Sequence, residues 1–344
     1  MNLGNSSEAF NSGLNFSLKR NIFGTFEVIL SNANFSLTKQ IVLLFIEFLQ
    51  ILFFIFHRVF IEYWKSNEVY EIIMSVLNYF MFYPLLKNDF NFFRIMFYIA
   101  FLVLIVFIAL LVSFLIRTQK NMKLDNILVY IYYEYFNLFA TVLLLPFLYA
   151  FTVPFKCKNG ETNKDYNNLI CLQSESIVMI IIGIFGTIIT IINGYLISLF
   201  FIDTIPDLNK QHTKYSNIYD LSLFVSKISL FFIMEFSEYI FETKEQKWIC
   251  SIVIFFIFLS NFLILSNGGV YVDLNIQKYV SFLRLFEVFC SLMVLLNIIF
   301  PKDSNFNSDM SMIFIITIFL IASFILMKTN IYKILLKKTK MNVI

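Results

Sequence analysis

Long runs of hydrophobic residues, separated by short polar stretches, recur along almost the whole chain. A helix needs roughly 20 mostly apolar residues to cross a bilayer. Lipid cannot hydrogen-bond to the backbone, so such runs are predicted to be α-helices. Four runs reach this length, and Glu134 is the one charged residue within them: Ile95–Ile116, Asn126–Phe155, Ser176–Ile202 and Trp248–Val272.

Four further runs are shorter or contain charged residues. They are Gln40–Phe60 with Glu47, Leu221–Phe241 with Lys227, Glu235 and Glu238, Tyr279–Phe300 with Arg284 and Glu287, and the short run Met310–Met327. The run with three charges is the least secure span, because charged residues are rare in transmembrane helices. We therefore predict an all-α, polytopic membrane protein with about eight spans, or seven if that run does not cross.

The polar residues that flank these runs divide the chain into three parts. Residues 1–38 form a polar N-terminal segment, residues 39–336 the transmembrane domain, and residues 337–344 a basic tail. In Leu18–Leu30 the apolar residues recur at helical spacing, and Tyr63–Pro84 is rich in aromatic residues. Each of these two segments is expected either to lie at the membrane interface or to pack as a loop helix.

Composition excludes several classes of protein. Hydrophobic residues make up 59% of the chain and charged residues 14%, whereas a soluble domain has about 25% charged residues. The net charge of +3 is too small to indicate nucleic-acid binding. With two histidines, four cysteines and no CxxC pattern, neither a metal site nor a cofactor is expected. The predicted partners are the lipid bilayer and either another protein or a second copy, in the plasma membrane or an endomembrane.

Basic residues predict the orientation of the spans, because lysine and arginine concentrate in cytoplasmic loops. With both termini inside, 14 basic residues fall in the inner segments and 10 in the outer loops, so we predict that both termini, including the basic tail, are cytosolic. The sequons at Asn5, Asn15 and Asn34 argue for the opposite placement of the N-terminus. Cys157 and Cys171 share an outer loop in this topology, so they are either a disulfide or two free thiols.

Polar residues inside the spans are the main candidates for function, because a charge in a bilayer costs about 3 kcal/mol or more. Gln40, Glu47, Gln50 and His57 fall within about 100° of a helical wheel, so this stripe is expected to face the bundle interior. Glu47 is expected either to bind a cation or proton, or to join an interhelical hydrogen bond.

The charges of Leu221–Phe241 need partners from other helices. Lys227 and Glu238 share a face but lie about 16 Å apart along the axis. Lys227 is therefore expected to approach Glu134 or Glu47, or to open to water, and Glu235 and Glu238 lie near the outer end of the run.

Two further patterns indicate contacts within and between helices. Arg284 and Glu287 are spaced i, i+3, so they can neutralise each other. A face of small residues is predicted to let another helix approach closely, and Asn193 is expected to add a hydrogen bond between helices. The face comprises Gly183, Thr187, Thr190 and Gly194.

No sequence motif of a known reaction is present, since the chain has no GxSxG, Walker or GxGxxG pattern. We therefore expect no enzymatic activity. Three hypotheses stay open: a sensory or signalling membrane module, an ion channel or transporter that uses the intramembrane Glu and Lys residues, and a structural subunit of a membrane complex. A water-filled path lined by the charges would favour transport, whereas a dry, closed bundle would favour the other two.

The chain also resembles the membrane region of large ciliate proteins similar to tiny macrocysts protein B. The resemblance covers roughly residues 20–300, and its residues are Phe26-Glu27-Val28-Ile29-Leu30, Lys39, Glu47-Phe48-Leu49-Gln50, Trp64, Tyr79-Phe80, Pro84, Ile95–Ile116, Leu145-Pro146 and Cys157. It implies a multi-span module that precedes cytosolic sensory regions, often PAS domains. This chain would then be a truncated or short relative. Around Cys171 it lacks the Trp and His of that family's pattern.

Overall fold

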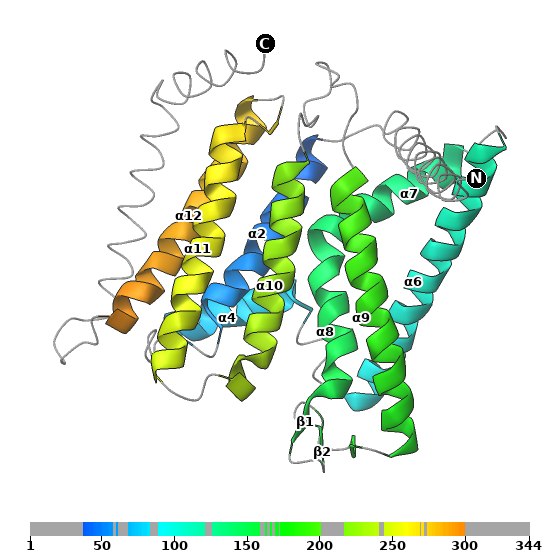
Figure 1. The fold of residues 1–344 in the computed structure, drawn as a ribbon, viewed down its shortest axis with the longest axis horizontal. Helices are drawn as coiled ribbons and strands as arrows, with labels where there is room; N and C mark the ends of the chain where they lie inside the picture. Colours follow the sequence, from blue (N-terminus) through cyan, green and yellow to red (C-terminus); the bar gives the residue numbers. More distant parts are fainter. Residues whose placement is uncertain are drawn as a thin grey trace, which may run out of the picture.

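The hydrophobic runs form long helices that lie roughly side by side, as Figure 1 shows. The computed structural model describes residues 37–57, 60, 68–82, 89–120, 126–158, 162–163, 166, 169–171, 173–200, 217–240, 244–268, 270–271 and 274–299. Residues 1–36 of the predicted N-terminal segment, including the amphipathic stretch Leu18–Leu30, lie outside these residues, as do the run Met310–Met327 and the basic tail, whereas residues 37 and 38 already belong to the first described helix.

The described helices are α2 (Leu37–Ile55), α4 (Glu68–Phe80), α6 (Phe90–Gln119), α7 (Asn126–Leu138), α8 (Leu144–Thr152), α9 (Ser174–Phe200), α10 (Ile218–Ile240), α11 (Lys244–Gly268) and α12 (Leu274–Ile299). A π-helical segment, η2 (Phe139–Leu143), joins α7 to α8, and a 3₁₀ turn, η3 (Val153–Phe155), follows α8. Two short antiparallel strands, β1 (Cys157–Lys158) and β2 (Thr162–Asn163), form the next loop. The predicted all-α class is confirmed.

Six described segments are long and apolar enough to cross a membrane, so the chain is a multi-span membrane protein. They are α2, α6, the α7–α8 segment, α9, α11 and α12. Helix α10 has a similar length and lies in the bundle beside them, but it contains Asp220, Lys227, Glu235 and Glu238. The six helices are roughly consistent with the expected count of about eight spans, and the run Met310–Met327 lies outside the described residues.

Helix α2 lies at the centre of the bundle. It contacts α4, α10, α12 and the π-helical segment η2. Consecutive helices also pack on one another, α8 on α9, α9 on α10, α10 on α11, and α11 on α12, while α6 packs on α8 and α9. Helix α12 closes the arrangement by returning to α2 (Figure 1).

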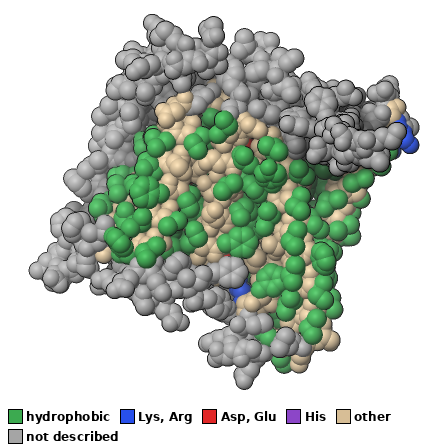
Figure 2. Space-filling view, in the orientation of Figure 1, with side chains coloured by type: hydrophobic (Ala, Val, Ile, Leu, Met, Phe, Trp, Pro, Cys, Tyr) green, Lys and Arg blue, Asp and Glu red, His purple; other side chains and the backbone are tan. Residues whose placement is uncertain are grey.

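The helices differ in how much of their surface is covered by protein. In an apolar stretch of 18 residues within Phe90–Arg117 of α6, 11% of the residues are buried, whereas 72% are buried in the corresponding stretch within Ile127–Phe155. Helix α6 exposes large apolar side chains such as Ile95 and Leu102, which suit contact with lipid. Hydrophobic side chains likewise dominate the described part of the face in Figure 2.

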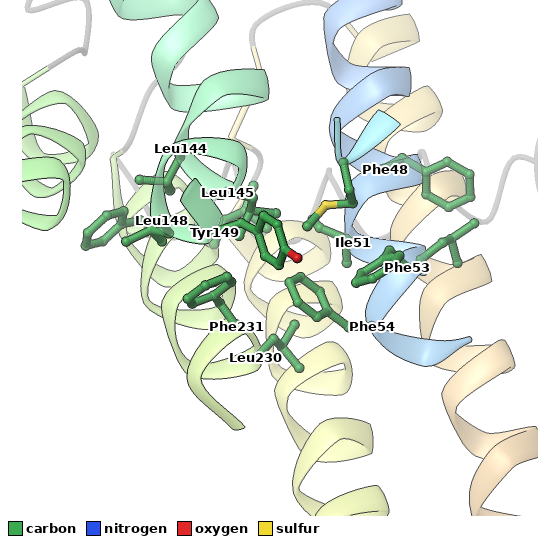
Figure 3. Close-up of a cluster of buried hydrophobic side chains, with 14 of the residues drawn as sticks. Phe48, Ile51, Phe53, Phe54, Leu144, Leu145, Leu148, Tyr149, Leu230 and Phe231 are labelled. Atoms are coloured by element: carbon green, nitrogen blue, oxygen red, sulfur yellow. The ribbon is translucent and has the colours of Figure 1, made fainter. Parts of the chain in front are cut away.

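The core between α2, α8 and α10 is built from large apolar side chains (Figure 3). Phe54 from α2, Tyr149 from α8 and Phe231 from α10 converge there, and each is at most 2% exposed. Close packing of this kind leaves little room for water between these three helices.

Helix α4 packs along α2 through Tyr70 and Leu77, which are buried, and exposes Ile72 and Val76. The Tyr70 hydroxyl donates a hydrogen bond to the Phe56 carbonyl oxygen at 2.9 Å. Burial raises the pKa of Tyr70 to about 12, so this hydroxyl keeps its proton near neutral pH.

The cysteines occupy two different settings. Cys171 is buried and disulfide-bonded, whereas Cys250 and Cys290 are buried free thiols. The side chain of Cys157 lies outside the described residues, so its pairing with Cys171 stays a prediction.

Small residues of α9 lie where its neighbours come closest. A Cβ atom on Gly183 would lie 2.6 Å from the Phe151 carbonyl oxygen, and one on Gly194 would lie 2.6 Å from the Phe224 ring. Glycine at these two positions therefore allows α8 and α10 to approach α9. Thr187 and Thr190 lie on the same helix, and their hydroxyl groups have no hydrogen-bond partner among the described residues.

We predict that Gly183→Ala lowers the free energy of unfolding by about 1–3 kcal/mol, the usual cost of overpacking. The added methyl group meets a backbone carbonyl of α8, which cannot rotate away as a side chain can. The measurement is unfolding in detergent micelles, monitored by circular dichroism. Ile184→Ala is the control, because Ile184 is the next residue of α9 and is 47% exposed. Equal stability of Gly183→Ala and wild type would contradict the close contact.

Candidate functional site

Glu47 lies in the middle of α2 and binds two cationic side chains from two other helices. Its Oε1 atom accepts a hydrogen bond from Lys227 Nζ of α10 at 2.5 Å. Its Oε2 atom accepts one from Arg284 Nη2 of α12 at 3.0 Å. One carboxylate therefore joins α2, α10 and α12.

Arg284 uses each of its three nitrogen atoms. Besides Glu47, it donates from Nη1 to Glu287 Oε1 at 2.5 Å and from Nε to the Tyr219 hydroxyl oxygen at 2.7 Å. Glu287 is three residues further along α12, at the expected i, i+3 spacing. The planar guanidinium group suits this task, because its donors point in fixed directions.

These four charged residues form what we call the Glu47 network: Glu47, Lys227, Arg284 and Glu287. The side chains are 1–4% exposed, so the network is shielded from both lipid and water. Two positive and two negative groups give it a formal charge of zero. Pairing of this kind reduces the large cost of placing a charge in a low-dielectric interior.

Regular helical spacing explains why α2 presents Glu47 to the interior. Gln40, Glu47, Gln50 and His57 are all buried. Gln40 accepts a hydrogen bond from Asn137 Nδ2 at 3.2 Å, and the His57 ring packs edge-on against Phe53. The polar stripe is therefore buried along its length, and Gln40, Glu47 and Gln50 bind groups of other helices.

The π-helical segment η2 supplies the remaining acceptors for Lys227. Lys227 Nζ donates to the Ala140 carbonyl oxygen at 2.7 Å and lies 3.5 Å from that of Thr141. One residue further on, the Val142 carbonyl oxygen accepts a hydrogen bond from Gln50 Nε2 at 2.9 Å. Side chains of α2 and α10 thus bind backbone oxygens at the point where the helix widens.

Pro146 accounts for part of this irregularity. A proline has no backbone N–H, so the Val142 carbonyl oxygen, four residues earlier, receives no helical hydrogen bond from it. The proline ring also crowds that carbonyl group, and a one-turn π segment relieves the crowding. Sequence reasoning missed this site, although the proline inside the Asn126–Phe155 run was the signal that could have found it.

Two other acidic residues that the sequence marked as candidate sites form ion pairs outside the Glu47 network. Glu134 pairs with Lys39, so of the two acceptors expected for Lys227 the structure selects Glu47. Glu235 pairs with Lys156, whose ammonium group also lies 4.4 Å from the centre of the Tyr149 ring. The side chain of Glu238 lies outside the described residues.

Further polar contacts hold neighbouring helices together. Asn193 of α9 donates to the Tyr135 hydroxyl of α7 at 2.7 Å. Asn261 of α11 shares hydrogen bonds with Ser222 and Ser226 of α10 at 2.8–3.2 Å. This second cluster was not expected from the sequence, because serine and asparagine are common and give no periodic signal there.

The charged groups of the site are used in ion pairs with one another. Each carboxylate oxygen of Glu47 is bound to a cation, and the described residues contain no cluster of three or more His, Cys, Asp or Glu side chains that could hold a metal ion. Comparisons of the chain with protein-family models, with curated proteins and with solved structures found no match. The geometry therefore has to carry the functional argument.

We predict that Glu47→Gln lowers the free energy of unfolding by about 3–5 kcal/mol, because it leaves two buried cations with a single anion. Lys227→Met is expected to cost less, since Glu47 keeps its hydrogen bond to Arg284. The double variant Glu47→Gln/Lys227→Met restores a neutral network and should recover part of the loss. SDS-induced unfolding in mixed micelles measures all three.

Glu71→Gln is the matched control, because Glu71 is an exposed acid on the neighbouring helix α4. Its stability should stay within about 0.5 kcal/mol of wild type. Purely additive losses in the double variant would show that Glu47 and Lys227 do not interact in the folded protein.

Proposed function

We propose that the protein is a non-enzymatic sensory or signalling module that transmits a conformational change across the membrane. The observation that carries this proposal is the closed and neutral Glu47 network, which joins α2, α10 and α12 at one point. All four charged side chains of the network are paired and almost fully buried. Such a bundle resists gradual deformation and favours discrete alternative packings.

The energetics of the network support a switch. Removing one partner from a buried ion pair costs about 3–5 kcal/mol, whereas exchanging both partners together costs much less. A stimulus that replaces one cation of Glu47 would therefore move α2, α10 and α12 in a single step. A sensory role is also what the sequence resemblance to the membrane region of PAS-containing ciliate proteins implies.

A transport function is the second candidate, and one observation favours it. Lys227 Nζ is held by a carboxylate and by backbone carbonyl oxygens of a π-helical segment. Transporters bind their coupling ions with the same kind of ligands, at interrupted helices near the middle of the membrane.

We predict that proteoliposomes containing the protein show no flux of K⁺ or Na⁺ above that of protein-free liposomes, measured with ion-sensitive dyes. Glu47→Gln should accelerate hydrogen–deuterium exchange in α2, α10 and α12 together, because the three helices lose one shared contact. Glu71→Gln, the exposed acid of α4, should leave exchange unchanged.

Two results would count against the signalling proposal. A cation flux that disappears in Glu47→Gln would instead establish transport. Faster exchange confined to α2 would show that the network is a local contact and does not couple the three helices.

A further inference from the structure

Helix α4 has apolar side chains on two opposite faces. On the side that packs against α2, Tyr70 and Leu77 are buried. On the other side, Ile72, Val76 and Tyr79 are 46–65% exposed and recur at i, i+4 and i+7. We call these three residues the outer face of α4. With 13 residues, α4 is about 20 Å long and is too short to cross a bilayer.

Two hydrogen bonds attach the ends of α4 to the last part of α2, beside which it lies in Figure 1. Near the start of α4, the Tyr70 hydroxyl donates to the Phe56 carbonyl oxygen at 2.9 Å. At the end of α4, the Phe80 carbonyl oxygen accepts from Gln50 Nε2 at 2.9 Å. The two attachment points on α2 are about 9 Å apart along the helix axis. Helix α4 is therefore confined to the end of the α2 span, where amphipathic helices insert their apolar face between lipid head groups and acyl chains.

The outer face of α4 continues the lipid-facing surface of α2. In the N-terminal half of α2, Val42 and Phe45 are 50% and 44% exposed. Leu52 and Phe56 lie within about 80° of these two residues on a helical wheel, yet both are buried. Helix α4 packs against this part of α2, so it takes the place of lipid there. The outer face of α4 is therefore the surface that the bilayer meets at this end of α2.

Gln50 connects α4 to the π-helical segment. The amide nitrogen that binds the Phe80 carbonyl oxygen also donates to the Val142 carbonyl oxygen of η2 at 2.9 Å. Earlier in the same segment, the Ala140 carbonyl oxygen accepts a hydrogen bond from Lys227 Nζ at 2.7 Å. One side-chain amide and one π-helical turn thus join a surface helix to a buried cation of the network.

We propose that α4 is an in-plane membrane helix whose outer face binds the phospholipid bilayer at the boundary between head groups and acyl chains, and that lipid packing at this level controls the Glu47 network. The inference rests on the proposed signalling function, since it names the stimulus. Looser lipid packing opens space for the outer face, so α4 moves away from α2. The hydrogen bond between Gln50 and Phe80 then breaks, and the segment that holds Lys227 loses a support. Because α4 contains no Lys or Arg, the interaction is hydrophobic and does not depend on anionic lipid.

The first measurement locates the outer face. Tyr79→Trp is made in a Trp64→Phe/Trp248→Phe background, which removes both native tryptophans. In proteoliposomes of dioleoyl-phosphatidylcholine, lipid brominated next to the head group should quench its fluorescence more strongly than lipid brominated near the chain ends. Leu102→Trp in the same background is the control, because Leu102 is an exposed residue in the middle of α6. It should show the opposite order.

Three results would overturn this location. Quenching of Tyr79→Trp by aqueous iodide, but by neither brominated lipid, would place the outer face in water. The same order of quenching as Leu102→Trp would place it deep in the bilayer. Absence of quenching by all three agents would show that protein covers the outer face, and cross-linking of Tyr79→Cys between chains would identify that protein as a second copy.

The second measurement tests the coupling to the network. Hydrogen–deuterium exchange is compared in dioleoyl-phosphatidylcholine and palmitoyl-oleoyl-phosphatidylcholine, which share a head group and differ in acyl-chain packing. In the looser dioleoyl bilayer, η2 and α10 should exchange about two- to tenfold faster, as expected for the loss of one net hydrogen bond. Ile72→Ser/Val76→Ser, which makes the outer face polar, should abolish this difference. Glu71→Gln, at an exposed position of α4 beside the outer face, should keep it.

Gln50→Met separates the two parts of the proposal. It removes both hydrogen bonds of Gln50 and should abolish the difference in exchange, while the quenching of Tyr79→Trp keeps its order. Equal exchange of wild type in the two lipids would overturn the proposal and leave α4 as a membrane anchor only. The Glu47 network would then respond to another stimulus. Failure of the proposed function has a different signature, a Glu47-dependent ion flux through proteoliposomes, and does not alter the quenching.

Discussion

Two buried cations depend on one carboxylate, and this dependence constrains the whole bundle. Glu47 can bind Lys227 and Arg284 together only if α2, α10 and α12 keep a fixed height relative to one another. A slip of one helical turn, about 5.4 Å, would separate at least one pair in an environment where an unpaired charge is very costly. Apolar packing alone does not fix the relative height of the helices, because aliphatic side chains pack similarly in several registers. The network therefore selects one arrangement among many that are equally hydrophobic.

Backbone carbonyl groups of the α7–α8 segment also help to hold this one helix arrangement. Where Pro146 interrupts the hydrogen bonds of the α7–α8 segment, the Ala140 and Val142 carbonyl oxygens accept hydrogen bonds from Lys227 and Gln50. Interrupted helices persist in membranes only when other groups satisfy the freed backbone. The side chains of α2 and α10 thus stabilise the irregular segment, and the segment in turn holds Lys227 in place. Each part therefore stabilises the other.

Much of the fold can be predicted from the apolar runs, because the length of an uncharged run is read directly from the sequence. The run Asn126–Phe155 has the same ends as the helical segment from α7 to η3, and the pair Arg284–Glu287 follows from spacing within one helix. Periodicity also identifies the face of α2 that contains Glu47. It does not identify the helix that this face meets, so Glu134 and Glu47 were equal candidates for Lys227. The choice depends on contacts between residues 180 positions apart in the sequence, which no local pattern encodes.

The distance in sequence between Glu47 and its partners also affects how the protein is made. Lys227 follows Glu47 by 180 residues and Arg284 by 237 residues. At synthesis rates of about 5–20 residues per second, the second interval corresponds to roughly 10–50 s. Neither cation exists over the first 180 residues of this interval, and Arg284 is still missing over the rest. Until α10 and α12 arrive, Glu47 must be kept out of the lipid core, either at the water interface or beside an insertion factor. Assembly of this bundle is therefore constrained in time, because α2 is translated long before α10 and α12 and reaches its final depth only after they do.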